Sequence, residues 1–248
     1  MSKVLCFTLA ALALIAPQLS LAIGPQEPTQ PGETIIVSGG VSLFIWEKYK
    51  AQPHDKWWMN FVRAAQIRIA QIQQANPQQQ ITWLVYRPAY SSRSRQDGQD
   101  YASAIHAMGS SMHVRMIWFD RTSQLLSYIN AGQPRDRVKI NDLEFFVHSN
   151  KACFLFDYSN IIDSASKVWL HENDLTKINR GIFTSDALVR SWGCHTGESM
   201  SEKFYQATGT KMIGAEGKTT YTSRIENQGG ILNGIVPTLS SPGARWTN

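Results

Sequence analysis

Cys194 and His148 are the two residues of this chain whose types and positions favour nucleophilic chemistry. Cys194 follows an apolar run that ends in Trp192-Gly193, and His148 ends a second apolar run over 143–147. A cysteine becomes a nucleophile when a nearby base accepts its proton and when hydrogen-bond donors face the oxyanion that forms. The sequence therefore predicts a Cys–His pair for acyl transfer, in which Cys194 attacks a carbonyl and His148 takes the thiol proton.

Three further residues are expected to complete this site. The backbone N–H of Cys194 and an N–H near Ser149 are the candidate oxyanion donors. Gly193, Ser149 and His195 are expected to line the oxyanion pocket or the cleft beside it. A third group that would orient the imidazole cannot be identified from the sequence, and Glu144 and Asp157 are the two candidates for it.

No cofactor or metal is expected, because a Cys–His pair needs neither. One alternative is a zinc site built from two histidines and two cysteines. These residues are His148, Cys153, His171 and Cys194. Their spacings match no compact zinc motif.

The alternation of apolar strands with amphipathic segments predicts the scaffold that positions the pair. Strands are expected at 33–38, 81–86, 114–119, 139–148, 188–192 and 211–215, and helices at 55–75, 99–112, 122–131 and 198–208. Residues 152–158 are expected to form a returning strand, 87–97 a polar loop and 169–179 a short acidic helix. This order predicts an α/β three-layer sandwich with a mostly parallel sheet. Adjacent parallel strands would then carry His148 and Cys194 to the carboxyl edge, where ligands bind.

The N-terminus of the 248-residue chain reads as an export signal. Residues 1–22 combine a basic Lys3, an apolar stretch and small residues before Ile23, which is typical of a cleaved secretory signal peptide. Residues 23–32 are expected to be an extended leader, and 33–248 a single domain with an irregular tail from about 222. The predicted location is periplasmic or extracellular, without stable membrane insertion after cleavage. The sequence leaves the oligomeric state open.

The composition favours a globular enzyme or binding protein. Hydrophobic residues make up 43% of the chain, and the formal net charge is +5. The basic residues are scattered, so no nucleic-acid partner is expected. The densest basic group is Arg87, Arg93 and Arg95, which is interpreted as part of a solvated loop, with a phosphate contact as the alternative.

The order of these features resembles the caspase-like (clan CD) cysteine peptidases over about Lys139 to Ala215. The interval from His148 to Cys194 is close to the roughly 50 residues found in caspases. The Cys194-His195-Thr196-Gly197 turn looks like the Cys-x-Thr-Gly turn of that broader fold. The resemblance implies hydrolysis of a peptide or protein substrate. The chain differs from the family in carrying Ser149 where a glycine usually follows the histidine, and it lacks the caspase pentapeptide.

Two other functions are compatible with the sequence. A non-catalytic caspase-like binding or effector-associated protein would be favoured by a Cys153–Cys194 disulfide, which an oxidising compartment permits, or by loss of the family glycine. A cell-wall enzyme is the third, because Ser191-Trp192-Gly193-Cys194 resembles the Ser-His-Gly-Cys signature of L,D-transpeptidases. Those enzymes are β-rich, and their motif histidine lies much nearer to the cysteine.

Overall fold

The computed structural model of the chain describes residues 30–41, 58–157, 167–221 and 237–247. The predicted signal peptide, most of the leader and residues 55–57 of the helix expected at 55–75 lie outside these ranges. Residues 30–32, which were expected to extend away from the body, instead contact it. The backbone N–H of Gln30 donates to Asp186 Oδ2 at 3.1 Å, and the Asn141 side chain donates to the Gln30 carbonyl at 3.1 Å.

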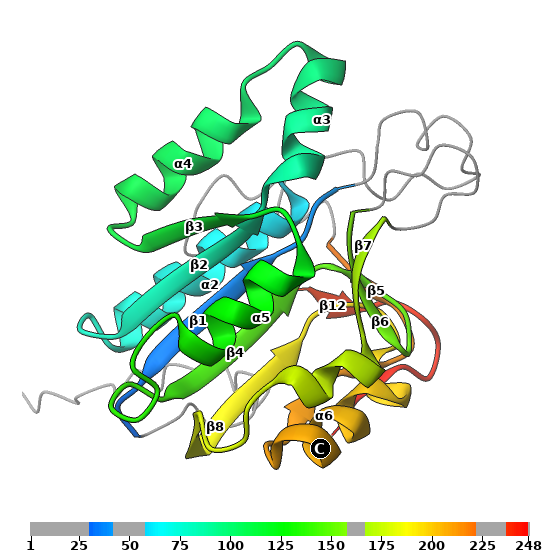
Figure 1. Cartoon of the computed structure of the whole chain (residues 1–248). Helices are drawn as coiled ribbons and strands as arrows, with labels where there is room; N and C mark the ends of the chain where they lie inside the picture. Colours follow the sequence, from blue (N-terminus) through cyan, green and yellow to red (C-terminus); the bar gives the residue numbers. More distant parts are fainter. Residues whose placement is uncertain (1–29, 42–57, 158–166, 222–236, 248) are drawn as a thin grey trace, which may run out of the picture.

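Six parallel strands form the central sheet (Figure 1). They are β1 (Glu33–Ser38), β2 (Gln80–Tyr86), β3 (Arg115–Phe119), β4 (Ile140–Phe146), β8 (Phe183–Ser191) and β9 (Met212–Ile213), in the order β3-β2-β1-β4-β8-β9. Every neighbouring pair is parallel. β1 is buried along its whole length, which explains its continuous Ile35-Ile36-Val37 run: a parallel strand is covered on both faces.

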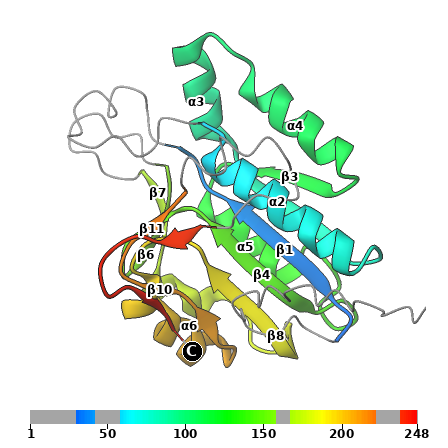
Figure 2. The same ribbon diagram turned by 180° about the vertical axis from the view of Figure 1, so that it is seen from behind.

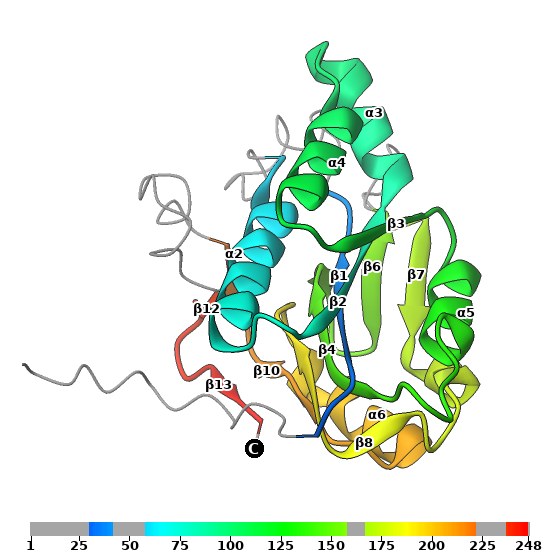
Figure 3. The same ribbon diagram turned by 90° about the vertical axis from the view of Figure 1, so that its left-hand side faces the viewer.

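Helices cover both faces of this sheet, so the predicted α/β sandwich is confirmed. α2 (Asn60–Ala75) and α4 (Tyr101–Ser111) lie on one face, and α5 (Thr122–Ala131) and α6 (Met200–Thr208) on the other (Figures 2 and 3). The two cores follow from strand alternation. Ile36 and Trp83 pack with α2, whereas Ile35 and Leu84 belong to the core that contains α5 and α6.

The segment expected as a polar loop is a helix, α3 (Arg87–Asp97). Pro88 occupies the first turn, where its missing N–H costs nothing, and Gly98 ends the helix with φ of 65°. Tyr90 is fully buried, and Arg93 is buried with its Nε donating to Asp97 at 2.7 Å. The polar composition concealed this helix, because an ion-paired arginine occupies part of its buried face.

Two other expected elements have different forms. Residues 168–177 form a strand, β7 (Val168–His171), and a short 3-10 helix, η1 (Glu172–Lys177), in place of one acidic helix. β7 is strand because it pairs with β6 (Cys153–Asp157), which also pairs with β5 (His148–Ser149) in a three-stranded antiparallel sheet. The expected strand 211–215 is divided between β9 and β10 (Ala215–Glu216), which join different sheets.

The C-terminal region contains ordered strands where an irregular tail was expected. β12 (Thr238–Leu239) pairs with β11 (Thr219–Thr220), and β13 (Arg245–Trp246) pairs with β10, both antiparallel. The backbone N–H of Thr247 donates to the Gly214 carbonyl at 2.9 Å. These pairings place β12 and β13 beside β11 and β10, the two strands that follow β9.

Candidate active site

The two candidate catalytic residues follow neighbouring strands. β4 and β8 pair in parallel with Phe145 opposite Ser191. The ladder continues beyond β8, where the backbone N–H of Trp192 donates to the Phe145 carbonyl at 2.9 Å. His148 stands two residues beyond β4, and Cys194 three residues beyond β8. Both therefore lie past the carboxyl edge of the sheet, as parallel pairing requires.

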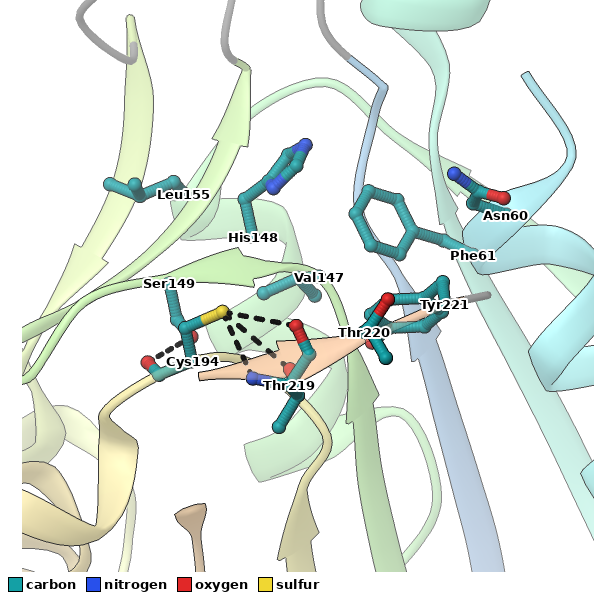
Figure 4. A pocket seen from close by; sticks show the side chains of 10 residues that line it. All are labelled: Asn60, Phe61, Val147, His148, Ser149, Leu155, Cys194, Thr219, Thr220 and Tyr221. Atoms are coloured by element: carbon teal, nitrogen blue, oxygen red, sulfur yellow. Dashed lines mark hydrogen bonds between the residues drawn. The ribbon is translucent and has the colours of Figure 1, made fainter. Parts of the chain in front are cut away.

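A cavity of about 170 Å³ opens at this edge (Figure 4). Its walls come from α2, from the residues after β4, from β6, from the loop after β8 and from β11. The lining residues are Asn60, Phe61, Val147, His148, Ser149, Leu155, Cys194, Thr219, Thr220 and Tyr221. Among the residues predicted for the site, His148, Ser149 and Cys194 share this cavity, whereas Gly193 and His195 do not contribute to its lining.

Three polar groups of Thr219 contact the thiol of Cys194. Its backbone N–H donates to Sγ at 3.4 Å. Its carbonyl oxygen and its hydroxyl oxygen each lie 3.6 Å from Sγ. Figure 4 shows Sγ directed at Thr219, with the His148 ring above it in that view. In the described part of the chain, the hydrogen bonds of this sulfur go to Thr219 and none goes to His148.

The imidazole of His148 packs against an aromatic wall. Its ring lies edge-on to Phe61, with 4.9 Å between ring centroids, and Phe61 makes a second edge-on contact with Tyr221 at 4.8 Å. The helix α2 therefore helps to orient the predicted base. Phe61 belongs to the buried core on the α2 face and also forms part of the cavity wall.

Ser149 and Gly193 hold the cysteine loop against β5. The Ser149 hydroxyl donates to the backbone carbonyl of Cys194 at 2.7 Å. A Cβ atom at Gly193 would overlap the Ser149 hydroxyl and would lie 2.9 Å from the Val147 carbonyl oxygen. Only glycine fits there, because the main chain of the loop passes directly over β5. Ser149 thus binds the main chain of the candidate nucleophile.

His195 stabilises the turn after the nucleophile. Its backbone is left-handed, with φ of 62°, and its N–H donates to the Gly217 carbonyl at 2.7 Å. Its Nδ1 hydrogen-bonds the Glu198 carboxylate, and this bond lowers the pKa of Glu198. His195 therefore connects the loop after β8 to its own 3-10 turn, η2 (Thr196–Glu198), and to the segment before β11.

The two candidates for an orienting carboxylate bind other groups. Glu144 is fully buried on the α2 face, where it accepts hydrogen bonds from Arg68 Nε and from Trp192 Nε1, each at 2.6 Å. Asp157 accepts a hydrogen bond from the Tyr86 hydroxyl at 2.9 Å. Neither carboxylate lines the cavity.

Trp192 links the buried carboxylate to the cavity. Its indole donates to Glu144, and its carbonyl accepts from the Thr219 hydroxyl at 2.9 Å and from the Tyr221 hydroxyl at 3.2 Å. The indole also makes an edge-on contact with Trp246 of β13, at 5.4 Å between centroids. The residue two positions before the nucleophile thus fixes both the cysteine loop and β11.

The described cysteines, Cys153 and Cys194, are both free, so the structure contradicts the disulfide considered from the sequence. Burial and the carboxylates of Glu172 and Asp174 raise the pKa of the Cys153 thiol. Within the described ranges, no three His, Cys, Asp or Glu side chains are grouped to hold a metal ion. The alternative zinc site is therefore absent from the residues proposed for it.

Thr219 and Tyr221 are the site residues that sequence reasoning missed. They lie on β11 and directly after it, and their hydroxyls donate to the Trp192 carbonyl, a contact between distant parts of the chain that no local pattern reveals. The run Thr219-Thr220-Tyr221 does carry a signal, since β-branched and aromatic residues favour strands. That signal identifies a strand without identifying its neighbour.

Comparison of the chain with family models, with curated proteins and with solved structures gave no match. Across the described residues, no helix has the length and apolar character needed to cross a bilayer.

Proposed function

We propose that this protein is an exported cysteine hydrolase with a caspase-like arrangement, and that it cleaves peptide bonds with Cys194 as nucleophile and His148 as base. The observation that carries the proposal is the shared cavity: a free thiol and an imidazole, delivered by adjacent parallel strands, line the same space at the carboxyl edge of the sheet. Ligands bind at this edge in open α/β folds.

The chemistry proceeds by acyl transfer. His148 accepts the proton of the Cys194 thiol, either in direct contact or through one water, as general bases do. The thiolate attacks the carbonyl carbon, a C–S bond forms, and the carbonyl electrons move to the oxygen. The tetrahedral intermediate collapses as the C–N bond breaks, and the amine leaves with the proton held on His148. Water, deprotonated by His148, then attacks the thioester and releases the acid and the thiol.

The lining favours a substrate with an uncharged side chain beside the scissile bond. Its walls combine Phe61, Leu155 and Tyr221 with the neutral polar groups of Asn60 and Thr220. The described lining carries no Asp, Glu, Lys or Arg, and a cavity of about 170 Å³ suits a single side chain. A mostly apolar pocket with a few polar groups is typical of a specific small binding site.

The proposal is tested by alkylation and by cleavage on the natively folded mature protein. Iodoacetamide labelling is followed across pH by mass spectrometry, without reductant, and fluorogenic peptides with neutral, acidic and basic residues before the scissile bond are assayed in parallel. We expect Cys194 to label faster than Cys153 at mildly acidic pH, His148→Ala to slow Cys194 labelling, and the neutral peptides to be cleaved.

Matched variants separate catalysis from folding. Cys194→Ala is expected to abolish cleavage, whereas Cys153→Ala, at the other described cysteine, is expected to retain it. If Cys194 labels no faster than Cys153, and if His148→Ala changes neither labelling nor cleavage, the Cys–His mechanism is refuted.

One observation favours the second candidate, a non-catalytic binding protein with the same fold. The thiol of Cys194 is hydrogen-bonded to Thr219 and not to His148. Under this alternative the cavity would hold an uncharged peptide side chain without cleaving it, so peptides would bind to Cys194→Ala and to the unmodified protein with equal affinity and remain intact. The transpeptidase alternative receives no such support, because the parallel six-stranded sheet differs from the β-rich architecture expected of it.

A further inference from the structure

Thr219 is placed to respond to the charge of the cysteine. Its backbone N–H already donates to Cys194 Sγ, at 3.4 Å. Its hydroxyl oxygen lies 3.6 Å from the same sulfur while the hydroxyl hydrogen is directed to the Trp192 carbonyl, 2.9 Å away. In this state the hydroxyl presents a lone pair to the thiol, and the S–H can donate to that oxygen or to the Thr219 carbonyl.

Loss of the thiol proton changes the sulfur from a hydrogen-bond donor into a charged hydrogen-bond acceptor. A thiolate accepts hydrogen bonds and can no longer donate one, so a lone pair directed at it becomes repulsive. Rotation about the Cβ–Oγ1 bond of Thr219 would turn the hydroxyl hydrogen toward Sγ without moving a heavy atom. The Trp192 carbonyl would keep a donor throughout, because the Tyr221 hydroxyl also reaches it, at 3.2 Å.

We propose that Thr219 is the positioning residue for the nucleophile: its N–H and its rotating hydroxyl hold the Cys194 thiolate while Tyr221 keeps the Trp192 carbonyl bonded. The inference rests on the proposed function, in that it explains how the thiolate is held once His148 has taken the proton. Thr219 lies on β11, where Leu239 of β12 is paired opposite it.

The test measures the rate of Cys194 alkylation by iodoacetamide against pH for the full mature protein and three variants. Thr219→Val keeps the shape and the backbone N–H but removes the hydroxyl. A hydrogen bond to a charged group is strong enough to change an equilibrium about tenfold, so we expect labelling at mildly acidic pH to slow by about that factor and the pH profile to move to higher pH. Thr219→Ser, which restores a hydroxyl, is expected to recover most of the rate.

Two controls exclude a general effect on the fold. Thr238→Val makes the same substitution on β12, at an exposed residue opposite Thr220, and is expected to leave the profile unchanged. Cys153 in each variant reports local opening, because its labelling would accelerate if the sheet around it loosened. If Thr219→Val fails to fold by this criterion, Thr219→Ala is measured against Thr219→Ser in its place.

The outcomes separate this inference from the proposed function. If the variants without the hydroxyl label at the rate of the unmodified protein across the pH range, the role of Thr219 is refuted, even where peptides are cleaved. If they label about tenfold more slowly and serine restores the rate, the role stands, even where no peptide is cleaved and the hydrolase function fails.

Discussion

Replacing Glu144 with glutamine tests whether a buried charge network supports the candidate site. Burial by itself would raise the pKa of Glu144, but the charges of Arg68 and Arg190, together with the hydrogen bonds from Arg68 and Trp192, outweigh it and lower this pKa to about 2. The ordinary value is 4.5. A shift of this size corresponds to roughly 3 kcal/mol of stability at neutral pH, at the lower end of the roughly 3–5 kcal/mol expected when one partner of a buried ion pair is removed.

The sign of the pH dependence follows from the direction of the shift. Because the pKa of Glu144 is lower in the folded protein, its stabilisation is complete well above pH 4.5 and is lost as the pH falls toward 2. Glutamine does not titrate in this range. The difference in free energy of unfolding between the protein and Glu144→Gln should therefore shrink by about half by roughly pH 3.

Urea unfolding at a series of pH values, followed by tryptophan fluorescence, measures this difference. At neutral pH the melting temperature of Glu144→Gln should fall by roughly 6–12 °C for a domain of this size. Glu202→Gln, at an exposed residue of α6 that accepts a hydrogen bond from Gln206, is the matched control and should change stability by less than about 0.5 kcal/mol. A loss below about 1 kcal/mol for Glu144→Gln, or a loss independent of pH, would refute the reasoning.

Two further substitutions test the packing around the site. Gly193→Ala should destabilise the protein by about 1–3 kcal/mol and change Cys194 labelling, because the new methyl would lie 2.9 Å from the Val147 carbonyl; unaltered unfolding and labelling would contradict the close approach. Tyr86→Phe should cost about 1–3 kcal/mol in urea unfolding, because it removes the hydroxyl that donates to the buried Asp157; a neutral effect would show that this carboxylate is satisfied in another way.

The central sheet could be predicted because apolar runs in the sequence mark its strands. Ile35-Ile36-Val37 is a continuous apolar run, as a strand covered on both faces favours. β4 is interrupted by Asn141, Asp142 and Glu144, but its apolar residues still indicate a strand. Parallel pairing then placed His148 and Cys194 at one edge without further information. The helix α3 escaped prediction because one of its buried residues is Arg93, whose burial depends on its ion pair with Asp97.

The surroundings of the thiol could not be predicted, and the reason is physical. Thr219 is held beside Cys194 by its hydroxyl bond to Trp192, by the bond from His195 to Gly217 and by the pairing of β11 with β12. Ser149 reaches the Cys194 carbonyl where Gly193 lets the loop approach closely. Contacts of this kind depend on tertiary geometry and leave no periodic signal. The ends of β4 and β8 determine that His148 and Cys194 lie close together. The short strand β11 and the loop after β8 determine which groups contact the thiol.

Trp192 makes the buried network and the cavity dependent on each other. Its indole donates to the Glu144 carboxylate, and its carbonyl accepts from the hydroxyls of Thr219 and Tyr221. A buried ion pair adds little stability compared with a well-packed apolar core, and in some proteins its role is to select one arrangement. Here the arrangement fixed is the orientation of the residue two positions before the thiol. Glu144 is buried among arginines on β4, whose continuation carries the candidate base His148. Its hydrogen bond to Trp192 reaches the loop that carries the candidate nucleophile.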